Sequence, residues 1–217
     1  MPHHHSLDTF QLNINKLQQR FQQPLPGLDR LIDMAPENRR RQPVERARKR
    51  GCREGSVLLL LYPLQGITHT VLTVRSASLR THAGQISLPG GRIEAGESAQ
   101  QAALREAWEE LDIKAEELEV IGPLSELYIP PSNFCLQPIV AYSNHRPDFQ
   151  AQEAEVAQLL EIPLDFFVGP TNRRVEYWPF GDEKRRIPFF LYEQHKIWGA
   201  TCMIMAEMAA LWEERAT

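Results

Sequence analysis

Residues 90–113 of the chain read GGRIEAGESAQQAALREAWEELDI, and this stretch decides the fold. Two glycines mark a tight turn, and Ser98 with Gln101 three residues later forms a capping box, which starts a helix. We expect this helix to run from Ser98 to Leu111. At 3.6 residues per turn, one face of the helix collects the apolar side chains that we expect to pack on the core: Leu104, Ala107, Trp108 and Leu111.

The opposite face of this helix carries Glu106, Glu109 and Glu110 at positions i, i+3 and i+4. Like charges at these spacings destabilise a helix by roughly 0.2–0.5 kcal/mol per pair, so they need either solvent or a cation. An acidic face washed by solvent is one interpretation. The other is a metal site, because the turn at 88–91 can bring backbone carbonyls onto the glutamates. Oxygen ligands of this kind suit Mg²⁺ or Mn²⁺, which often bridge to phosphates.

The charge of the chain is unevenly distributed. Its 217 residues, enough for one decorated domain, hold 24 Lys and Arg against 28 Asp and Glu, which gives a net charge of −4. The stretch 91–119 has nine acids and three bases, so it carries −6 and the remainder +2. This balance excludes a globally basic nucleic-acid binder. Ordinary contents of hydrophobic (42%) and charged (24%) residues disfavour a disordered or fibrous chain.

Cysteine usage indicates a reducing compartment. Cys52, Cys135 and Cys202 are odd in number, widely separated and without a C-x-x-C pair, so we expect buried thiols and neither a disulfide framework nor a zinc site. The longest apolar run, 57–62, is too short to span a bilayer, and the N-terminus has no apolar segment typical of a signal peptide. A cytoplasmic protein without a membrane partner is expected.

The chain divides near residue 50. Residues 1–50 are interpreted as a helical and basic N-terminal extension, with an amphipathic stretch at 10–21 followed by a basic stretch. The basic stretch is either a solvated surface or a patch that attracts phosphates, and its cations are Arg39, Arg40, Arg41, Arg46, Arg48, Lys49, Arg50 and Arg53. Residues 51–217 are interpreted as the main domain.

Short apolar runs in the main domain predict strands separated by turn residues. The expected strands are 57–62, 69–75, 124–128, 134–142 and 156–162, followed by a hairpin from 189–192 and 196–198. A closing helix at 201–214 has apolar residues at helical spacing. Strands and helices do not alternate regularly, which favours an α+β fold or a three-layer α/β/α sandwich.

Gly91, Glu97 and the run from Arg105 to Ile113 together resemble the Nudix box, G-x5-E-x7-R-E-U-x-E-E-x-G-U, where U is aliphatic. Every charged position of the pattern matches at the right spacing. One departure is Asp112, where the family has a glycine that ends the helix with positive φ. Asp is among the better substitutes for glycine there, so we expect a modest cost in stability and no loss of metal ligands.

The resemblance implies a Nudix-type α/β/α sandwich with a mixed central sheet, and hydrolysis of a diphosphate linked to another moiety. It further implies that the three helix glutamates and the Gly90 carbonyl hold Mg²⁺ or Mn²⁺, with Glu109 or Glu110 as general base. Glu153 and Glu155 are alternative bases. Glu97 and Arg105 are expected to pair in a supporting role that fixes the loop against the helix.

The segment before the box resembles the signature of coenzyme A pyrophosphatases, L-L-T-x-R-[SA]-x3-R-x3-G-x3-F-P-G-G. It begins at Val71 and ends at Gly91, with Val71 and Leu88 as apolar departures. This resemblance implies hydrolysis of coenzyme A or its derivatives to adenosine 3′,5′-bisphosphate and 4′-phosphopantetheine. Arg75 and Arg80 would bind substrate phosphates, although Arg75 could instead form surface ion pairs, and His82 is a weaker candidate.

Other readings of the Nudix resemblance stay open. The substrate could be ADP-ribose, NADH or a dinucleotide, and a Nudix-fold binding module without catalysis is a further alternative. In the enzyme interpretation the partner is a small diphosphate, a nucleic acid is not expected, and a homodimer is left open.

Overall fold

A long hairpin begins the sheet. The computed structural model describes residues 3–27, 32–36, 44–76 and 84–214, and its first strands are β1 (Arg53–Leu64) and β2 (Ile67–Arg75). Both residues between them, Gln65 and Gly66, have positive φ (51° and 80°). A two-residue turn of this kind matches the twist of the flanking strands. The predicted strands 57–62 and 69–75 lie within this hairpin, which is longer than expected because its ends are polar.

The central sheet is mixed. β7 (Phe134–Tyr142) pairs parallel with β1, whereas the other printed pairs of the sheet are antiparallel. The strands β3, β2, β1, β7 and β5 are neighbours in that order, while β4 pairs with β1, β6 with β7 and β8 with β2. The remaining strands of this sheet are β3 (Ile86–Ser87), β4 (Gly90–Arg92), β5 (Glu119–Pro123), β6 (Leu127–Ile129) and β8 (Val156–Pro163).

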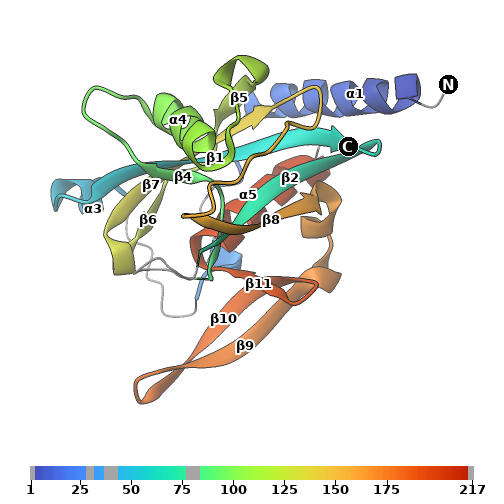
Figure 1. Ribbon diagram of the computed structural model, residues 1–217. Coiled ribbons are helices and arrows are strands. Elements are labelled where there is room, and N and C mark those ends of the chain that lie inside the picture. The colour runs from blue at the N-terminus through green and yellow to red at the C-terminus, as the bar shows by residue number, and fades with distance from the viewer. Residues whose placement is uncertain (1–2, 28–31, 37–43, 77–83, 215–217) are drawn as a thin grey trace.

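Helices cover both faces of this sheet (Figure 1). Alternate residues of β1 point to opposite faces: Leu58 and Leu60 pack in a cluster with α4 (Ala99–Leu111), whereas Leu59 and Leu61 pack with α1 and α5. These two helices are α1 (His3–Phe21) and α5 (Gly199–Glu214). The α/β/α sandwich with a mixed central sheet is thereby confirmed. None of the helices in the described part of the chain is long and apolar enough to cross a membrane.

The N-terminal segment is packed against the main body. Phe10, Ile14 and Leu17 of α1 are at most 2% exposed and belong to the same core cluster as α5. The segment therefore contributes to the core and is not a loose appendage. The boundary at residue 50 stays a prediction.

Two cations in the described part of the basic stretch have partners within the chain. α3 (Val44–Lys49) carries Arg48, which donates hydrogen bonds to the carboxylates of Glu54 and Glu126. The guanidinium of Arg53 lies 4.5 Å from the centre of the Phe134 ring. Arg39, Arg40 and Arg41 lie outside the described residues. Arg48 and Arg53 are thus occupied by neighbours within the chain.

Cys52 and Cys135 form a disulfide, with their Cα atoms 5.8 Å apart, so the expectation of three free thiols is wrong. Because β1 and β7 pair in parallel, Cys135 lies opposite Glu54, two residues from Cys52, and this brings the two cysteines within reach of each other. The separation of 83 residues hid this pairing from the sequence. Cys202 is free and buried, as expected.

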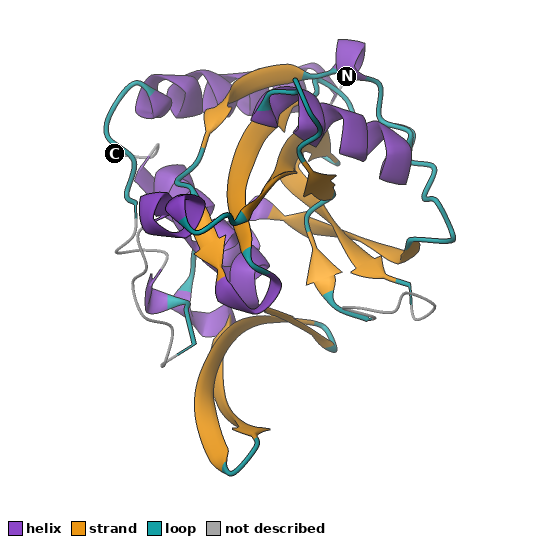
Figure 2. Cartoon of the chain, turned by 90° about the vertical axis from the view of Figure 1, so that its left-hand side faces the viewer, coloured by secondary structure: helices purple, strands orange, loops and turns teal. Residues whose placement is uncertain are grey.

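A second sheet projects from the body (Figure 2). It is antiparallel, in the order β11-β10-β9, and consists of β9 (Arg173–Phe180), β10 (Glu183–Tyr192) and β11 (His195–Trp198). The sequence predicted only 189–192 and 196–198 of it. β9 and the first part of β10 are rich in charged and exposed residues, so they lack the buried apolar run that identifies the other strands. The predicted strand 124–128 is also displaced, because the observed strands are β5 and β6 on either side of Leu124.

Candidate active site

The turn at 88–91 lies against both β1 and α4, and its glycines allow this close approach. Gly90 pairs with Val57 and Gly91 with Ser56. A Cβ at Gly90, whose φ is 156°, would lie less than 3.0 Å from the backbone of β1, and one at Gly91 would lie as close to the Glu106 carboxylate. Glycine at both positions therefore lets the helix carboxylates reach the backbone of the turn.

The ends of α4 are formed as the sequence indicates. The Ser98 amide donates to the side chain of Gln101 (2.8 Å), and the Gln101 amide donates to the Ser98 hydroxyl (3.2 Å), which completes the capping box. At the other end Asp112 adopts the left-handed conformation, with φ 56°. Its amide donates to the Trp108 carbonyl at 2.8 Å. The expected positive φ at Asp112 is confirmed.

The orientation of α4 differs from the expectation. Trp108 is 55% exposed, whereas Glu110 is only 4% exposed, and the helix packs through Ala103, Ala107 and Leu111. Of the predicted packing face, Leu104, Ala107 and Leu111 do pack in the core cluster, but the placement of Trp108 in it is wrong, and Glu110 is buried instead. Small alanines let the helix lie close to the sheet, and this closeness buries one side of the glutamate row against the glycine turn.

Arg105 connects the acidic side chains. Its guanidinium donates to Glu97 (2.9 and 3.1 Å), Glu106 (2.9 Å) and Glu109 (3.0 Å), and also to the Arg92 carbonyl (3.0 Å). These bonds raise the pKa of Arg105, with Glu97 as the main cause, and the Arg105 hydrogen bond lowers the pKa of Glu97. The expected pairing of Glu97 with Arg105 is present, and it ties the loop to the helix.

Glu110 is the most buried of the acids in the site. Burial raises its pKa to about 7, and the charges of Glu155 and Glu106 act in the same direction. The Gly90 amide, which donates to Glu110 Oε1 at 3.3 Å, and the Arg75 guanidinium oppose this rise. Burial also raises the pKa of Glu106, with further contributions from the charges of neighbouring carboxylates. The site therefore holds several carboxylates that repel one another.

This donor set fits a divalent metal ion in its chemistry. All candidate side-chain ligands are carboxylates, the ligand type that Mg²⁺ and Mn²⁺ prefer, and a cation would relieve their repulsion. Within the residues that the structure describes, no three His, Cys, Asp or Glu side chains already converge as a metal site. Arg105 forms ion pairs with Glu106 and Glu109 and supplies positive charge there.

The remaining candidates lie at the ends of strands beside the glutamates. Arg75 ends β2 opposite Val156, and its buried Nε has no hydrogen-bond partner among the described atoms. The Glu155 carbonyl accepts from the Ser76 amide at 2.8 Å, and both Glu153 and Glu155 are exposed. Arg80 and His82 lie outside the described residues.

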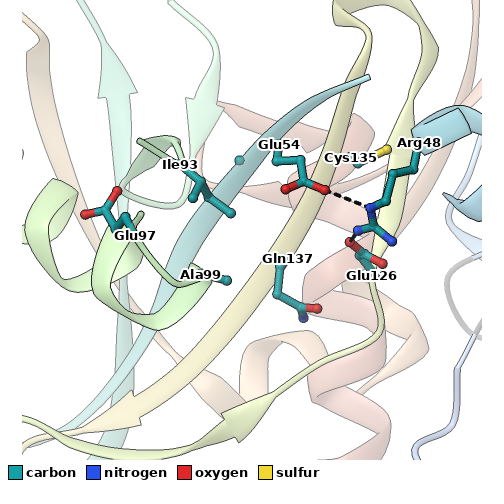
Figure 3. A pocket seen from close by; sticks show the side chains of 9 residues that line it. Arg48, Glu54, Ile93, Glu97, Ala99, Glu126, Cys135 and Gln137 are labelled. Carbon is teal, nitrogen blue, oxygen red and sulfur yellow. Dashed lines mark hydrogen bonds and ion pairs between the residues drawn. The ribbon is translucent and has the colours of Figure 1, made fainter. Parts of the chain in front are cut away.

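A separate polar pocket of about 260 Å³ lies beside the N-terminal end of α4 (Figure 3). It is lined by Glu97 and Ile93 on one side and by Arg48, Glu54 and Glu126 on the other. Glu106, Glu109 and Glu110 do not line it. The carboxylate cluster is therefore the better candidate for chemistry.

A known family shares these features. The sequence model of the NUDIX domain family matches residues 53–165. The chain belongs to the Nudix family. The relative named "Uncharacterized Nudix hydrolase NudL" from Pectobacterium atrosepticum is 38% identical over 144 residues, covering 64% of this chain and 72% of the relative. Nudix hydrolase 3 of Caenorhabditis elegans is 30% identical over 172 residues, covering 72% of each chain.

Among solved structures, the Nudix hydrolase RenU from M. smegmatis is 26% identical, with a TM-score of 0.46, and covers 52% of this chain and 71% of that chain. As a Nudix hydrolase, this chain is an enzyme that cleaves phosphoanhydride bonds in nucleoside diphosphate derivatives, and the family generally uses divalent metal ions.

Proposed function

We propose that this Nudix hydrolase cleaves the diphosphate bond of coenzyme A or its derivatives, releasing adenosine 3′,5′-bisphosphate and 4′-phosphopantetheine. The observation that carries this proposal is the position of Arg75. It belongs to the segment that resembles the coenzyme A pyrophosphatase signature, its charge acts on Glu110, and its buried Nε has no hydrogen-bond partner within the described part of the chain. A guanidinium with a free donor beside a carboxylate cluster suits a diphosphate oxygen.

Glu106, Glu109 and Glu110, with the Gly90 carbonyl, would hold Mg²⁺ or Mn²⁺. When bound, the metal ion supplies positive charge that neutralises the diphosphate and orients water. Arg105 would keep Glu97 in place and so keep the loop in register with α4. Arg75 orients the diphosphate, and Arg80 is proposed to assist it.

We assign the general base to Glu110 in preference to Glu109. Glu110 is only 4% exposed, so its carboxylate lies away from bulk water. Its Oε1 is held by the Gly90 amide, which fixes the carboxylate in one orientation. Glu109 lies nearer the surface, with a side chain 48% exposed.

The test compares coenzyme A, ADP-ribose and NADH as substrates of one preparation with Mg²⁺ and with Mn²⁺, with the products identified. We expect adenosine 3′,5′-bisphosphate and 4′-phosphopantetheine from coenzyme A at the highest kcat/KM. Cleavage of ADP-ribose or NADH with coenzyme A left intact would refute the proposed substrate. Arg75→Ala should raise KM, and Arg20→Ala, which breaks an ion pair with Glu214 far along the chain, serves as the control.

We also propose a cytoplasmic location, in which Cys52 and Cys135 would be neighbouring thiols because that compartment is reducing. Thiol labelling in intact cells tests this. Labelled Cys52 and Cys135 would support the location, and a pair protected from the label until a reductant is added would contradict it.

A further inference from the structure

The connection between β7 and β8, residues 143–155, crosses the C-terminal end of α4 without regular secondary structure. Two backbone hydrogen bonds tie it to the helix: the Gln150 amide donates to the Leu111 carbonyl at 3.0 Å, and the Gln152 amide donates to the Glu110 carbonyl at 2.9 Å. The connection therefore contacts the residue at the centre of the carboxylate cluster.

The connection ends at Glu155, close to the same end of α4. A turn is closed by the amides of Glu155 and Val156, which donate to the Gln152 carbonyl at 2.9 and 2.8 Å. The negative charge of Glu155 raises the pKa of both Glu106 and Glu110. Through this turn and the Gln152 amide, the backbone of Glu155 is tied to the backbone of Glu110, so the position of Glu155 depends on how the connection is held.

Two hydrogen bonds to a helix end are weak support for so long an irregular segment, since ordering each residue costs backbone entropy. A stronger anchor lies at Arg146. Its guanidinium donates hydrogen bonds to both carboxylate oxygens of Glu161 on β8, with Nε 2.8 Å from Oε2 and Nη2 2.9 Å from Oε1. A bidentate ion pair of this kind fixes the orientation of the two side chains as well as the distance between them.

The anchor extends into the core. The Tyr62 hydroxyl donates to Glu161 Oε2 at 2.8 Å, and Tyr62 is fully buried on β1. The Phe149 ring packs edge-on against Tyr62, with centroids 5.4 Å apart, and the Arg146 guanidinium lies 5.0 Å from the Phe149 centroid. Burial alone would raise the pKa of Glu161, but the hydrogen bonds from Arg146 and Tyr62 lower it. We name this group, Arg146, Phe149, Tyr62 and Glu161, the Arg146 clamp.

We propose that Arg146 is a positioning residue for hydrolysis, because the Arg146 clamp holds the β7–β8 connection on α4 and thereby places Glu155 beside Glu106 and Glu110. The inference rests on the proposed function in so far as it concerns turnover. Arg146 itself binds Glu161 and stacks on Phe149, so it acts through the β7–β8 connection and not on the substrate.

The first experiment measures kcat and KM of Arg146→Ala, Arg146→Lys and Arg20→Ala with coenzyme A and saturating Mg²⁺. We expect Arg146→Ala to lower kcat by about tenfold or more, since small displacements of a catalytic group have effects of this size, with KM changed by less than about twofold. Lysine keeps the charge but lacks the planar fork, so Arg146→Lys should be intermediate. Arg20→Ala also removes an Arg–Glu pair between two elements but should leave kcat unchanged. A kcat for Arg146→Ala within about twofold of the wild type overturns the proposal.

A double-mutant cycle with Glu155→Gln separates positioning from general destabilisation. If Arg146 acts through Glu155, Arg146→Ala should cost little further activity in the Glu155→Gln background. Losses that multiply would show that Arg146 acts by another route, and the proposed role would then be wrong.

Hydrogen exchange of the Gln150 and Gln152 amides gives a readout that does not depend on activity. Both amides should exchange at least about tenfold faster in Arg146→Ala than in the wild type, and at the wild-type rate in Arg20→Ala. Unchanged protection in Arg146→Ala overturns the clamp even if the enzyme hydrolyses coenzyme A. Conversely, a wild type that cleaves no diphosphate refutes the proposed function, while the exchange rates still test the clamp. If Arg146→Ala does not fold, Arg146→Lys is measured in its place.

Discussion

Replacing Glu110 by glutamine should stabilise the metal-free protein at alkaline pH. Burial raises the pKa of Glu110 from 4.5 to about 7, so between these values the folded state holds a proton that the unfolded state has lost. Wild-type stability therefore falls as pH rises through this window, and the penalty is complete above pH 7. Because one pKa unit corresponds to about 1.36 kcal/mol, the full penalty is about 3 kcal/mol. Glutamine does not titrate, yet it keeps an oxygen for the Gly90 amide.

The assay is urea unfolding of wild type and Glu110→Gln in EDTA at about pH 5.5 and about pH 8. We expect the stability difference, variant minus wild type, to increase by about 2 kcal/mol between these two pH values. Glu109→Gln is the control, since it removes an adjacent carboxylate whose side chain is half exposed. Glu110→Gln should also lose turnover. A stability difference that does not change with pH, or one that shrinks as pH rises, would refute the reasoning.

Three further substitutions test other parts of the structure. Gly91→Ala places a Cβ less than 3.0 Å from the Glu106 carboxylate, so kcat should fall by about tenfold or more with little change in urea unfolding; unchanged turnover would contradict this. Asp112→Gly relieves a left-handed residue with φ 56° and should raise the free energy of unfolding by about 1 kcal/mol, whereas a lower thermal midpoint would count against it. Cys52→Ser opens the bond to Cys135 and should cost about 2–4 kcal/mol of unfolding free energy without reductant; equal stability of variant and oxidised wild type would be the contrary result.

Local signals in the sequence predicted the parts of the structure that local interactions determine. The capping box at Ser98, the positive φ at Asp112 and the strand 134–142 depend on neighbours within a few residues, and all three are present. The spacing of Gly91, Glu97 and the run from Arg105 to Ile113 was also sufficient to identify the family. Periodicity shows which side chains share a face of a helix, but tertiary packing decides which face is covered. Trp108 illustrates this limit, because the small alanines of α4 pack where the larger ring was expected.

Features that join distant segments left no readable pattern. The bond between Cys52 and Cys135 depends on the parallel pairing of β1 with β7, and the exposed strand β9 has no apolar period. Arg146 belongs to no sequence motif, and only the fold brings Glu161 and Tyr62 to it. Of the site residues, Glu97 and Arg105 pair as expected. The roles assigned to Glu106, Glu109, Glu110, Gly90, Arg75 and Arg80 remain proposals for the experiments above.

The packing of α1 and α5 has a practical consequence for anyone who shortens the chain. The family match ends at residue 165 and begins at residue 53, so both helices fall outside it. Yet their side chains fill an entire side of the sheet, where Leu59 and Leu61 are completely buried. A fragment trimmed to the matched residues would expose that side to water as a continuous apolar surface and should aggregate. The matched segment identifies the family, but we expect only the whole sandwich to fold.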